Sequence, residues 1–335
     1  MRQSEMEVSV IIVTRNEEKY IEICLHSILN QELKGISFEI IVVDGLSSDG
    51  TLERAARILE SASVPYQIYL NPKRTLATGW NIGIQNALGK YVVRPDAHAT
   101  LLPNYIAIAL DSLKNLPDST GVVGGRLNTC STSWFGEIVS VALSTKVGVG
   151  NSSFRTSDSA TFSDTAVYGI YKKSVFETVG FFNETLVRHQ DTAFHFTLLK
   201  HGIKLYFNPK MKAIYFCRES LLAIAKQMFH NGYYLSDLIR IGILNAIQLR
   251  HMTPFIFFAF LLVLAGMGVF TMNYFIASIG IAIFIGYLIV LLSISIQKSI
   301  KLKSVKYILL LPVIFVMHLS YALGSFLGLI KSILK

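Results

Sequence analysis

The stretch RPDAHA, residues 94–99, carries the residues whose types and spacing could do chemistry. It presents a carboxylate, Asp96, and an imidazole, His98, two residues apart at the end of a short apolar run. Together they could ligate one divalent cation, because oxygen ligands suit Mg²⁺ and an imidazole shifts the preference toward Mn²⁺. They could equally form a salt-bridged turn in which His98 donates to a nearby carbonyl. The residues alone leave both interpretations open.

Two other aspartates stand at the ends of predicted elements. Asp44 closes the apolar run FEIIVVD, where an Asp often caps the following turn. Asp191 lies at the start of the stretch QDTAFHFTLLKHG, where a carboxylate complements the dipole of a helix N-terminus. These structural roles are sufficient for each residue taken alone. A chemical role requires a fold that gathers them.

The first hundred residues alternate apolar, β-branched runs with amphipathic stretches, which predicts an α/β fold with a mostly parallel, Rossmann-like sheet. The predicted strands are 8–14, 38–44, 66–70 and 90–94. The predicted helices are 17–31, 52–62 and 75–89, the last stopped by Gly89. Ligands bind at the carboxyl ends of parallel strands, and Thr14, Asp44 and Asp96 all lie there.

The alternation stops near residue 120. Strands are predicted at 121–127 and 166–173, and a helix at 190–202. Residues 126–165 are rich in Ser, Thr and Gly with little periodicity, which predicts a long substrate-binding loop. Residues 219–250 have the pattern of amphipathic helices that could lie on a membrane surface.

Several common sites are missing from the sequence. The first predicted strand ends in TRNEE rather than in G-x-G-x-x-G, which argues against a dinucleotide-binding dehydrogenase. The phosphate-binding pattern G-x-x-x-x-G-K-[ST] and the zinc-protease pattern H-E-x-x-H do not occur either. The three cysteines, Cys24, Cys130 and Cys217, are scattered and are expected to be reduced thiols.

Four motifs in order along residues 8 to about 235 resemble family 2 glycosyltransferases of the GT-A fold. They are TRNEE, VVDGLSSDGT, NPKRTLATGWNIGIQNALGKYVVRPDAHA and HQD. The pair formed by NPKR…G…N and R-x-DAH is the more specific part. Within the family the chain looks most similar to the membrane-anchored transferases of succinoglycan synthesis.

The resemblance implies roles for the candidate residues. The donor nucleotide would be bound by Thr14, Asn16, Glu17, Asp44, Arg74 and Asp96. A divalent metal, Mn²⁺ or Mg²⁺, would be held by Asp96 and His98, the latter standing where most relatives have the second Asp of a D-x-D motif. Asp191 would be the general base of an inverting transfer. The acceptor side, more weakly indicated, would include Tyr168, Gly169, Gln190 and Gln227.

Three positions depart from the family pattern. Gln190 replaces the more usual Glu, and His230 stands near the position expected for an Arg that binds phosphate. His98 is the third departure. The neighbouring His189 and His195 are expected to be structural rather than metal ligands.

The C-terminal part predicts a membrane anchor. Three apolar runs, 254–272, 274–296 and 308–330, are each long enough to cross a bilayer core. The loop QKSIKLKSVKY between the last two has four lysines and no acid, so it is expected in the cytoplasm, with the TMNY turn outside. Three full crossings would leave the basic end KSILK outside, against this rule. The third run could instead be re-entrant or interfacial, and this is left open.

Charge separates the two parts of the chain. Asp237 is the last of the 22 acidic residues, and eight of the 31 Lys and Arg residues follow it, so almost all of the net charge of +9 lies beside the apolar runs. Anionic lipid rather than nucleic acid is the expected partner. The N-terminus, with acidic residues ahead of a short apolar strand, is not expected to be a signal peptide. The expected organisation is a cytoplasmic GT-A domain at 1–218, membrane-proximal helices at 219–252 and a transmembrane region at 253–335.

The resemblance implies an enzyme that moves a sugar from a nucleotide-diphosphate donor, most simply a UDP-sugar, to a polyprenyl-diphosphate-linked glycan. The reaction would take place at the cytoplasmic face of the cell inner (plasma) membrane, in surface or exopolysaccharide synthesis. Two alternatives stay open: direct transfer to polyprenyl phosphate, and a catalytically silent GT-A domain that serves as a membrane scaffold.

Overall fold

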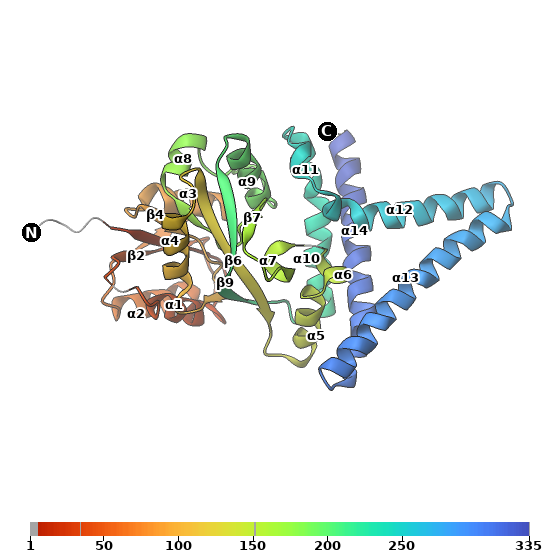
Figure 1. Cartoon of the computed structure of the whole chain (residues 1–335), viewed down its shortest axis with the longest axis horizontal. Helices are drawn as coiled ribbons and strands as arrows, with labels where there is room; N and C mark the ends of the chain where they lie inside the picture. Colours follow the sequence, from red (N-terminus) through yellow and green to blue (C-terminus); the bar gives the residue numbers. More distant parts are fainter. Residues whose placement is uncertain (1–5, 34, 151, 335) are drawn as a thin grey trace, which may run out of the picture. The chain divides into compact units, whose positions relative to one another are not determined.

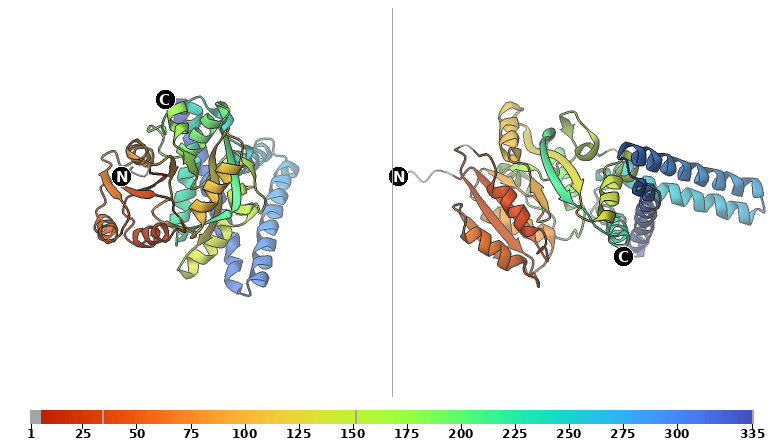
Figure 2. Two further views of the ribbon diagram at one scale, coloured as in Figure 1. Left: turned by 60° about the vertical axis from the view of Figure 1, so that its left-hand side comes forward. Right: turned by 90° about the horizontal axis from the view of Figure 1, so that it is seen from below.

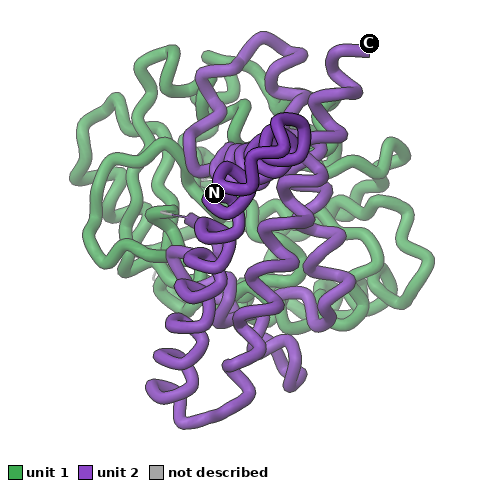
Figure 3. The backbone as a smooth tube through the Cα atoms, turned by 90° about the vertical axis from the view of Figure 1, so that its right-hand side faces the viewer, with its two compact units in different colours: residues 1–128, 152–216 green, residues 129–151, 217–335 purple. Residues whose placement is uncertain are grey.

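The computed structural model describes residues 6–33, 35–150 and 152–334. The chain divides into two compact units, shown in Figure 3. The first comprises the residues up to Asn128 and Ser152–Phe216; the second comprises Thr129–Asn151 and Cys217–Lys335. The sequence suggests one continuous first domain up to residue 218. Instead the segment 129–151 groups with the C-terminal helices.

Half of the sheet in the first unit is parallel. Its strands are β1 (Val8–Thr14), β2 (Phe38–Asp44), β3 (Tyr66–Leu70) and β4 (Tyr91–Val93). They lie in the order β3-β2-β1-β4, and each neighbouring pair is parallel. Strands β1 and β2 are almost entirely buried, as their unbroken β-branched runs require. The predicted α/β architecture is confirmed for this part.

Helices connect these strands at the predicted places (Figure 1). They are α1 (Ile21–Leu29), α2 (Thr51–Glu60) and α3 (Leu76–Asn86), and α4 (Tyr105–Asn115) follows the parallel part. Helix α3 begins at Thr75, whose hydroxyl accepts a hydrogen bond from the amide of Thr78. It ends at Ala87 and not at Gly89. Gly89 is needed for another reason, since a Cβ there would lie 2.5 Å from the amide nitrogen of Ser9 in β1.

The rest of the sheet is mixed. It contains β5 (Ala99–Leu101), β6 (Thr120–Cys130), β7 (Thr161–Ser163), β8 (Ile170–Lys172) and β9 (Lys204–Phe216). Strand β8 runs antiparallel to both β4 and β6, and β9 is antiparallel to β5 and β7. Helices α8 (Ser174–Val179) and α9 (Gln190–Lys200) follow β8. The described residues therefore form one nine-stranded mixed sheet, in which β3, β2, β1 and β4 are the parallel strands.

The segment 126–165 is not the loop that its composition predicts. It contains helices α5 (Trp134–Leu143), α6 (Lys146–Val149) and α7 (Ser153–Thr156) and strand β7. The hydroxyls of Ser133 and Thr145 accept hydrogen bonds from backbone amides at the starts of α5 and α6. Two of the Ser and Thr residues that suggested a loop are thus helix caps, a position in which these residue types are favoured.

The second unit is helical. After β9 come α10 (Leu221–Tyr233), α11 (Leu235–Arg240) and the short 3-10 helix η1 (Leu244–Ala246). Then follow α12 (Leu249–Phe270), α13 (Tyr274–Lys301), the 3-10 helix η2 (Val305–Leu309) and α14 (Leu310–Leu334). The described residues include three helical segments long and apolar enough to cross a membrane, namely Leu249–Phe270, Tyr274–Lys301 and Val305–Leu334.

Helices α10 and α14 approach each other closely through glycines (Figure 1). A Cβ added at Gly324 would lie 2.0 Å from the carbonyl oxygen of Phe229, and one at Gly328 would lie 2.2 Å from that of Tyr233. Gly232 on α10 is equally confined by the carbonyl oxygen of Tyr321, at 2.1 Å. Gly324 and Gly328 are four residues apart, the spacing at which small residues let two helix backbones touch.

Gly324→Ala is expected to destabilise the second unit, because the added methyl group would clash with the backbone carbonyl oxygen of Phe229. A backbone oxygen cannot move aside as the end of a flexible side chain can. Overpacking of this kind costs about 1–3 kcal/mol. The midpoint of thermal unfolding of the detergent-solubilised protein should fall by several degrees. Gly286→Ala is the matched control, since nothing in the described structure lies within 4 Å of a Cβ there. Equal midpoints for the two variants would contradict the close packing.

Candidate active site

The ends of the first strands bring three predicted residues to one edge of the sheet. Thr14 and Asp44 are register partners at the last positions of β1 and β2. Asp96, two residues beyond Arg94 at the end of β4, forms an isolated parallel bridge with Val13. Thr14 and Asp44 are buried. Parallel pairing of β1 with both β2 and β4 is therefore what assembles the site.

Asp44 caps the turn that follows its strand. Its Oδ2 accepts a hydrogen bond from the Ser47 amide at 2.8 Å, and its Oδ1 accepts one from the Ser47 hydroxyl at 2.5 Å. Asn16, in a left-handed conformation with φ 56°, accepts from the amide of Ser48 at 2.9 Å and thereby fastens the two loops together. The structural role foreseen for Asp44 is present. Its contact with a nucleotide base stays a prediction.

His98 lies between two carboxylates. Its Nδ1 is 2.9 Å from Glu17 Oε1, and its Nε2 is 4.0 Å from Asp96 Oδ2. Because a carboxylate can only accept, the hydrogen bond to Glu17 places a proton on Nδ1, and Nε2 is the ring nitrogen that faces Asp96. The Tyr168 hydroxyl donates to Asp96 Oδ2 at 3.0 Å. These contacts with Glu17 and Asp96 are those of the salt-bridged turn considered from the sequence, and the metal-binding role of His98 stays a prediction.

These side chains fit a divalent metal only in part. Among the described residues no group of three or more His, Cys, Asp or Glu side chains is arranged to hold an ion. Two adjacent ligands of an octahedral ion stand about 3.0 Å apart when each is about 2.1 Å from the ion, so Asp96 Oδ2 and His98 Nε2, at 4.0 Å, would have to move closer to share one ion. Mg²⁺ sites commonly use one or two protein ligands and complete their shell with substrate phosphates. Glu17 would orient the imidazole from behind.

Asp191 is held by a buried arginine. Arg94 Nη2 donates to Asp191 Oδ1 at 2.6 Å and to the Tyr171 hydroxyl, also at 2.6 Å. The Arg94 side chain is only 2% exposed, whereas that of Asp191 is 43% exposed. The carboxylate therefore faces solvent with one oxygen fixed. Burial is the main cause of a raised pKa of the Asp96 carboxyl, and the nearby Asp191 carboxylate raises this pKa further.

An aromatic enclosure surrounds the guanidinium group. Its carbon lies 4.0 Å from the ring centre of Trp80, 4.7 Å from that of Phe182 and 5.0 Å from that of Tyr171. Burial alone would lower the pKa of Arg94, but Asp191 and Tyr171 raise it above its ordinary value, so the group stays charged. Cation–π contacts with desolvated rings add to this.

His195 completes the enclosure as a neutral group. Its Nε2 lies 2.7 Å from the Tyr171 hydroxyl, and the side chain is buried. Burial lowers the pKa of His195 to about 4, with Asp191 acting in the opposite direction and Arg94 in the same one. The imidazole therefore accepts a hydrogen bond from the Tyr171 hydroxyl, and the oxygen of this hydroxyl accepts one from Arg94. This supports the structural role predicted for His195.

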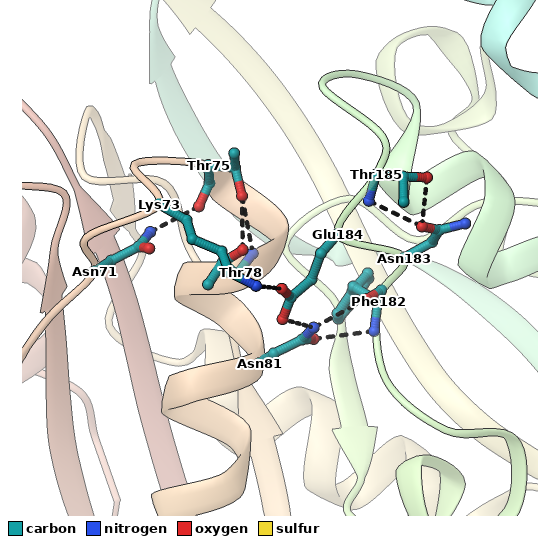
Figure 4. A network of polar contacts seen from close by, with 9 residues as sticks. All are labelled: Asn71, Lys73, Thr75, Thr78, Asn81, Phe182, Asn183, Glu184 and Thr185. Carbon is teal, nitrogen blue, oxygen red and sulfur yellow. Dashed lines mark hydrogen bonds and ion pairs between the residues drawn. The ribbon is translucent and has the colours of Figure 1, made fainter.

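The NPKR loop is fixed by a polar network (Figure 4). The amide of Asn71 donates to the carbonyl of Asp44 at 2.7 Å, and the Asn71 side chain donates to the carbonyl of Thr75 at 2.8 Å. Arg74 lies between them, exposed and with φ 56°. The network thus holds the predicted donor-binding arginine at the end of β2.

The same network reaches the loop before α9. Asn81 accepts from the amide of Phe182 at 3.0 Å and donates to its carbonyl at 2.9 Å. Glu184 accepts from Asn81 at 3.0 Å and from Lys73 at 2.8 Å (Figure 4). By fixing Phe182, Asn81 also fixes one wall of the Arg94 enclosure. Residues of the motif NPKR…G…N therefore link the donor-side loop to the loop that leads to Asp191, through hydrogen bonds and an ion pair.

The predicted acceptor-side residues of the first unit are engaged in contacts within that unit. Tyr168, with φ 46°, is turned toward Asp96. Gly169 does not leave room for a sugar as expected, because a Cβ there would lie 2.9 Å from Val122 and 3.0 Å from Tyr171. The Gln190 side chain is buried and donates to the carbonyl of Val187 at 2.7 Å. Gln227 lies on α10 in the second unit.

Reasoning from the sequence missed Arg94, Lys73, Asn81 and Glu184. Arg94 stands at the head of RPDAHA, yet nothing local indicates a partner 97 residues away. A signal was available, because an arginine directly after a buried strand requires a carboxylate elsewhere in the fold. Lys73 and Asn81 lie inside the motif that carries the resemblance, where a binding role seemed sufficient.

The similarity of this chain to known proteins agrees with this geometry. Residues 9–179 match Glycosyl transferase family 2. The chain is 34% identical over 330 residues, 97% of both chains, to the dolichyl N-acetyl-alpha-D-glucosaminyl phosphate 3-beta-D-2,3-diacetamido-2,3-dideoxy-beta-D-glucuronosyltransferase of Methanococcus voltae. It is 27% identical over 227 residues, 67% of both chains, to the succinoglycan biosynthesis protein ExoA of Rhizobium meliloti.

Solved structures agree on the fold. GalNAc-T7, crystallised with UDP, GalNAc and Mn²⁺, is similar with a TM-score of 0.52 and 16% identity, over 73% of this chain and 53% of that one. Three findings indicate the same family. They are the strand ends that carry Thr14, Asp44 and Asp96, the family match over half of the chain, and the relative that is similar over its full length. The chain belongs to glycosyl transferase family 2 and has the GT-A fold.

Proposed function

We propose that this chain is an inverting glycosyltransferase that moves a sugar from a UDP-sugar to a saccharide carried on a polyprenyl lipid. The observation that carries the proposal is the grouping of Asp96, His98 and a half-exposed Asp191 fixed by Arg94. One side of this group suits a metal-bound diphosphate, and the other suits a hydroxyl that must lose a proton. Inverting transfer requires these two functions and no nucleophile on the protein.

On the donor side, Asp96 and His98 would hold Mn²⁺ or Mg²⁺, with Glu17 orienting the imidazole. A bound divalent ion would neutralise charge on the departing diphosphate. The GalNAc-T7 structure contains UDP and Mn²⁺ together, which supports this choice of donor and metal. Arg74 and the loops of Thr14, Asn16 and Asp44 would surround the nucleotide.

On the acceptor side, Asp191 would take the proton of the attacking hydroxyl. The acceptor oxygen forms the new bond to the anomeric carbon as the bond from that carbon to the diphosphate oxygen breaks, which inverts the configuration. Arg94 holds Oδ1 at 2.6 Å and so fixes the direction of the carboxylate. The proton ends on Asp191, and UDP leaves.

The acceptor is a lipid-linked saccharide in this proposal. The Methanococcus voltae relative, similar over its whole length, is named for an acceptor consisting of dolichyl N-acetylglucosaminyl phosphate. Three apolar helices would keep the enzyme in the plane of such a substrate. Whether the lipid carries one phosphate or two, and whether the sugar goes directly to polyprenyl phosphate, is decided by analysing the lipid product by mass spectrometry.

Asp191→Asn should abolish transfer and leave donor binding intact. The amide keeps the size of the side chain and can still accept from Arg94, but it cannot take a proton. Loss of a general base lowers kcat by roughly 10²–10⁴-fold. The measurement is sugar transfer from UDP-sugars to lipid-linked acceptors, with UDP binding followed by calorimetry. Undiminished turnover would remove Asp191 from the mechanism, and a wild-type chain that binds no UDP would favour the silent scaffold.

Arg94→Met should impair the reaction through Asp191. Without the guanidinium group, Oδ1 of Asp191 loses the donor that fixes the direction of the carboxylate. Turnover should fall by at least about tenfold, which corresponds to an increase of about 1.36 kcal/mol in the activation free energy. Arg57→Met, which removes a surface ion pair with Glu22, is the matched control. A lower rate accompanied by an equal loss of UDP binding in calorimetry would limit Arg94 to a folding role.

His98→Asp should retain activity and shift the metal preference toward Mg²⁺, because carboxylate oxygens suit this ion better than imidazole nitrogen does. The ratio of rates in Mg²⁺ and in Mn²⁺ is measured for the variant and the parent chain. The exposed His201 provides the control substitution His201→Asp. An unchanged ratio would mean that His98 does not ligate the ion.

A further inference from the structure

The three apolar helices of the second unit do not form a parallel bundle. Helices α12 and α13 pack as a hairpin, in which a Cβ at Gly268 would lie 2.8 Å from that of Ala277. Helix α14 crosses this hairpin, as Figures 1 and 2 show from different directions, and the Phe315 ring centre on α14 lies 6.2 Å from those of Phe258 in α12 and Phe284 in α13. In the most apolar window of α14, 39% of the residues are buried within the protein, compared with 6% in α12 and in α13.

Polar segments of the same unit hold α14 near its start and at its middle. Lys306, just before α14, forms an ion pair with Glu137 of α5. His318 Nε2 lies 2.9 Å from the carbonyl oxygen of Val147, in the short helix α6. The same imidazole lies on its other side, through Nδ1, 2.9 Å from the Tyr287 hydroxyl of α13. The middle of α14 is therefore held between the hairpin and a short helix, whereas a helix that crosses the hydrocarbon core is not expected to have charged or polar partners from such short segments beside it.

The C-terminal half of α14 lies against α10. Helix α10 has 13 residues and is therefore about 20 Å long, too short for a hydrocarbon core of about 30 Å. It also carries the exposed Lys226. Since Gly324 and Gly328 touch the α10 backbone, this half of α14 must lie at the same depth as α10. Lys331 lies over the Tyr233 ring, 4.8 Å from its centre.

The opposite face of α14 is apolar and uncovered. Its exposed residues at helical spacing are Leu323, Phe326, Leu327 and Ile330. A helix with one packed face and one exposed apolar stripe is suited to lie in the membrane plane, with that stripe among the acyl chains.

The charges distinguish the two sides of the hairpin. Residues 251–297, which include the turn between α12 and α13, contain no Asp, Glu, Lys or Arg. The basic residues of the region stand before and after this stretch, at Arg240, Arg250, Lys298, Lys301, Lys303, Lys306, Lys331 and Lys335. With two crossings all of them lie on one side, as the positive-inside rule requires, whereas with three crossings Lys331 would lie on the other.

We propose that the chain crosses the membrane twice, through α12 and α13, and that α14 lies along the cytoplasmic surface with Leu323, Phe326, Leu327 and Ile330 in an anionic lipid leaflet. Helix α12, with 22 residues, is about 33 Å long and sufficient for the crossing. The proposal does not depend on the sugar or on the acceptor, and its tests need no catalytic activity.

The side of the C-terminus is tested with reporters on the full chain in bacterial cells. A C-terminal green fluorescent protein should fluoresce, and a C-terminal alkaline phosphatase should be inactive, because the chain ends in the cytoplasm. In intact cells an impermeant maleimide should label Tyr274→Cys at the hairpin turn above the background of the parent chain. An active phosphatase fusion, or a turn labelled only in inverted vesicles, would overturn the proposal.

The depth of α14 is tested by the quenching of tryptophan fluorescence in proteoliposomes that contain phosphatidylglycerol. Phe326→Trp on α14 should be quenched most strongly by lipids brominated near the glycerol backbone. Phe260→Trp, the same substitution in the middle of α12, should be quenched most strongly by lipids brominated near the chain ends. The parent chain supplies the signal of Trp80 and Trp134 for subtraction. Deep quenching of both introduced residues would mean that α14 crosses the membrane.

Discussion

The buried guanidinium group of Arg94 is the constraint on which the catalytic unit depends. A charge with 2% exposure must be paired and enclosed, or its desolvation would destabilise the fold. Its enclosure draws on four separate segments: α3 through Trp80, the loop before α9 through Phe182, β8 through Tyr171 and α9 through Asp191. Satisfying one buried charge thus fixes the direction of the carboxylate that faces the acceptor in the proposed mechanism.

The donor side is organised by backbone pairing rather than by charge. The register of β1 with β2 and the bridge from Val13 to Asp96 set the strand ends side by side. Polar loops then fasten these ends, with Ser47 on Asp44 and Asn71 on the carbonyl of Asp44. Asn81 and Glu184 join this side to the Arg94 enclosure, so the two halves of the site share one support (Figure 4).

In the second unit, glycines have the organising role. Gly232, Gly324 and Gly328 let α10 and α14 approach until their backbones touch, and this contact holds α14 alongside a short helix that carries the exposed Lys226. The apolarity of α14, taken alone, fits a third crossing equally well. Its packing, not its composition, distinguishes a crossing helix from one that lies along the surface.

The sequence by itself determined the elements whose signals are local. Periodicity located β1, β2, β3 and the helices between them, because burial on a regular lattice leaves a regular pattern. The motifs fixed the family, and strand ends identified Thr14, Asp44 and Asp96 as neighbours. The tertiary structure alone decided the pairing of Arg94 with Asp191, the filling of the space at Gly169 and the helices within 126–165. These depend on contacts between segments far apart in the chain, and no local pattern records which distant side chain will satisfy a buried group.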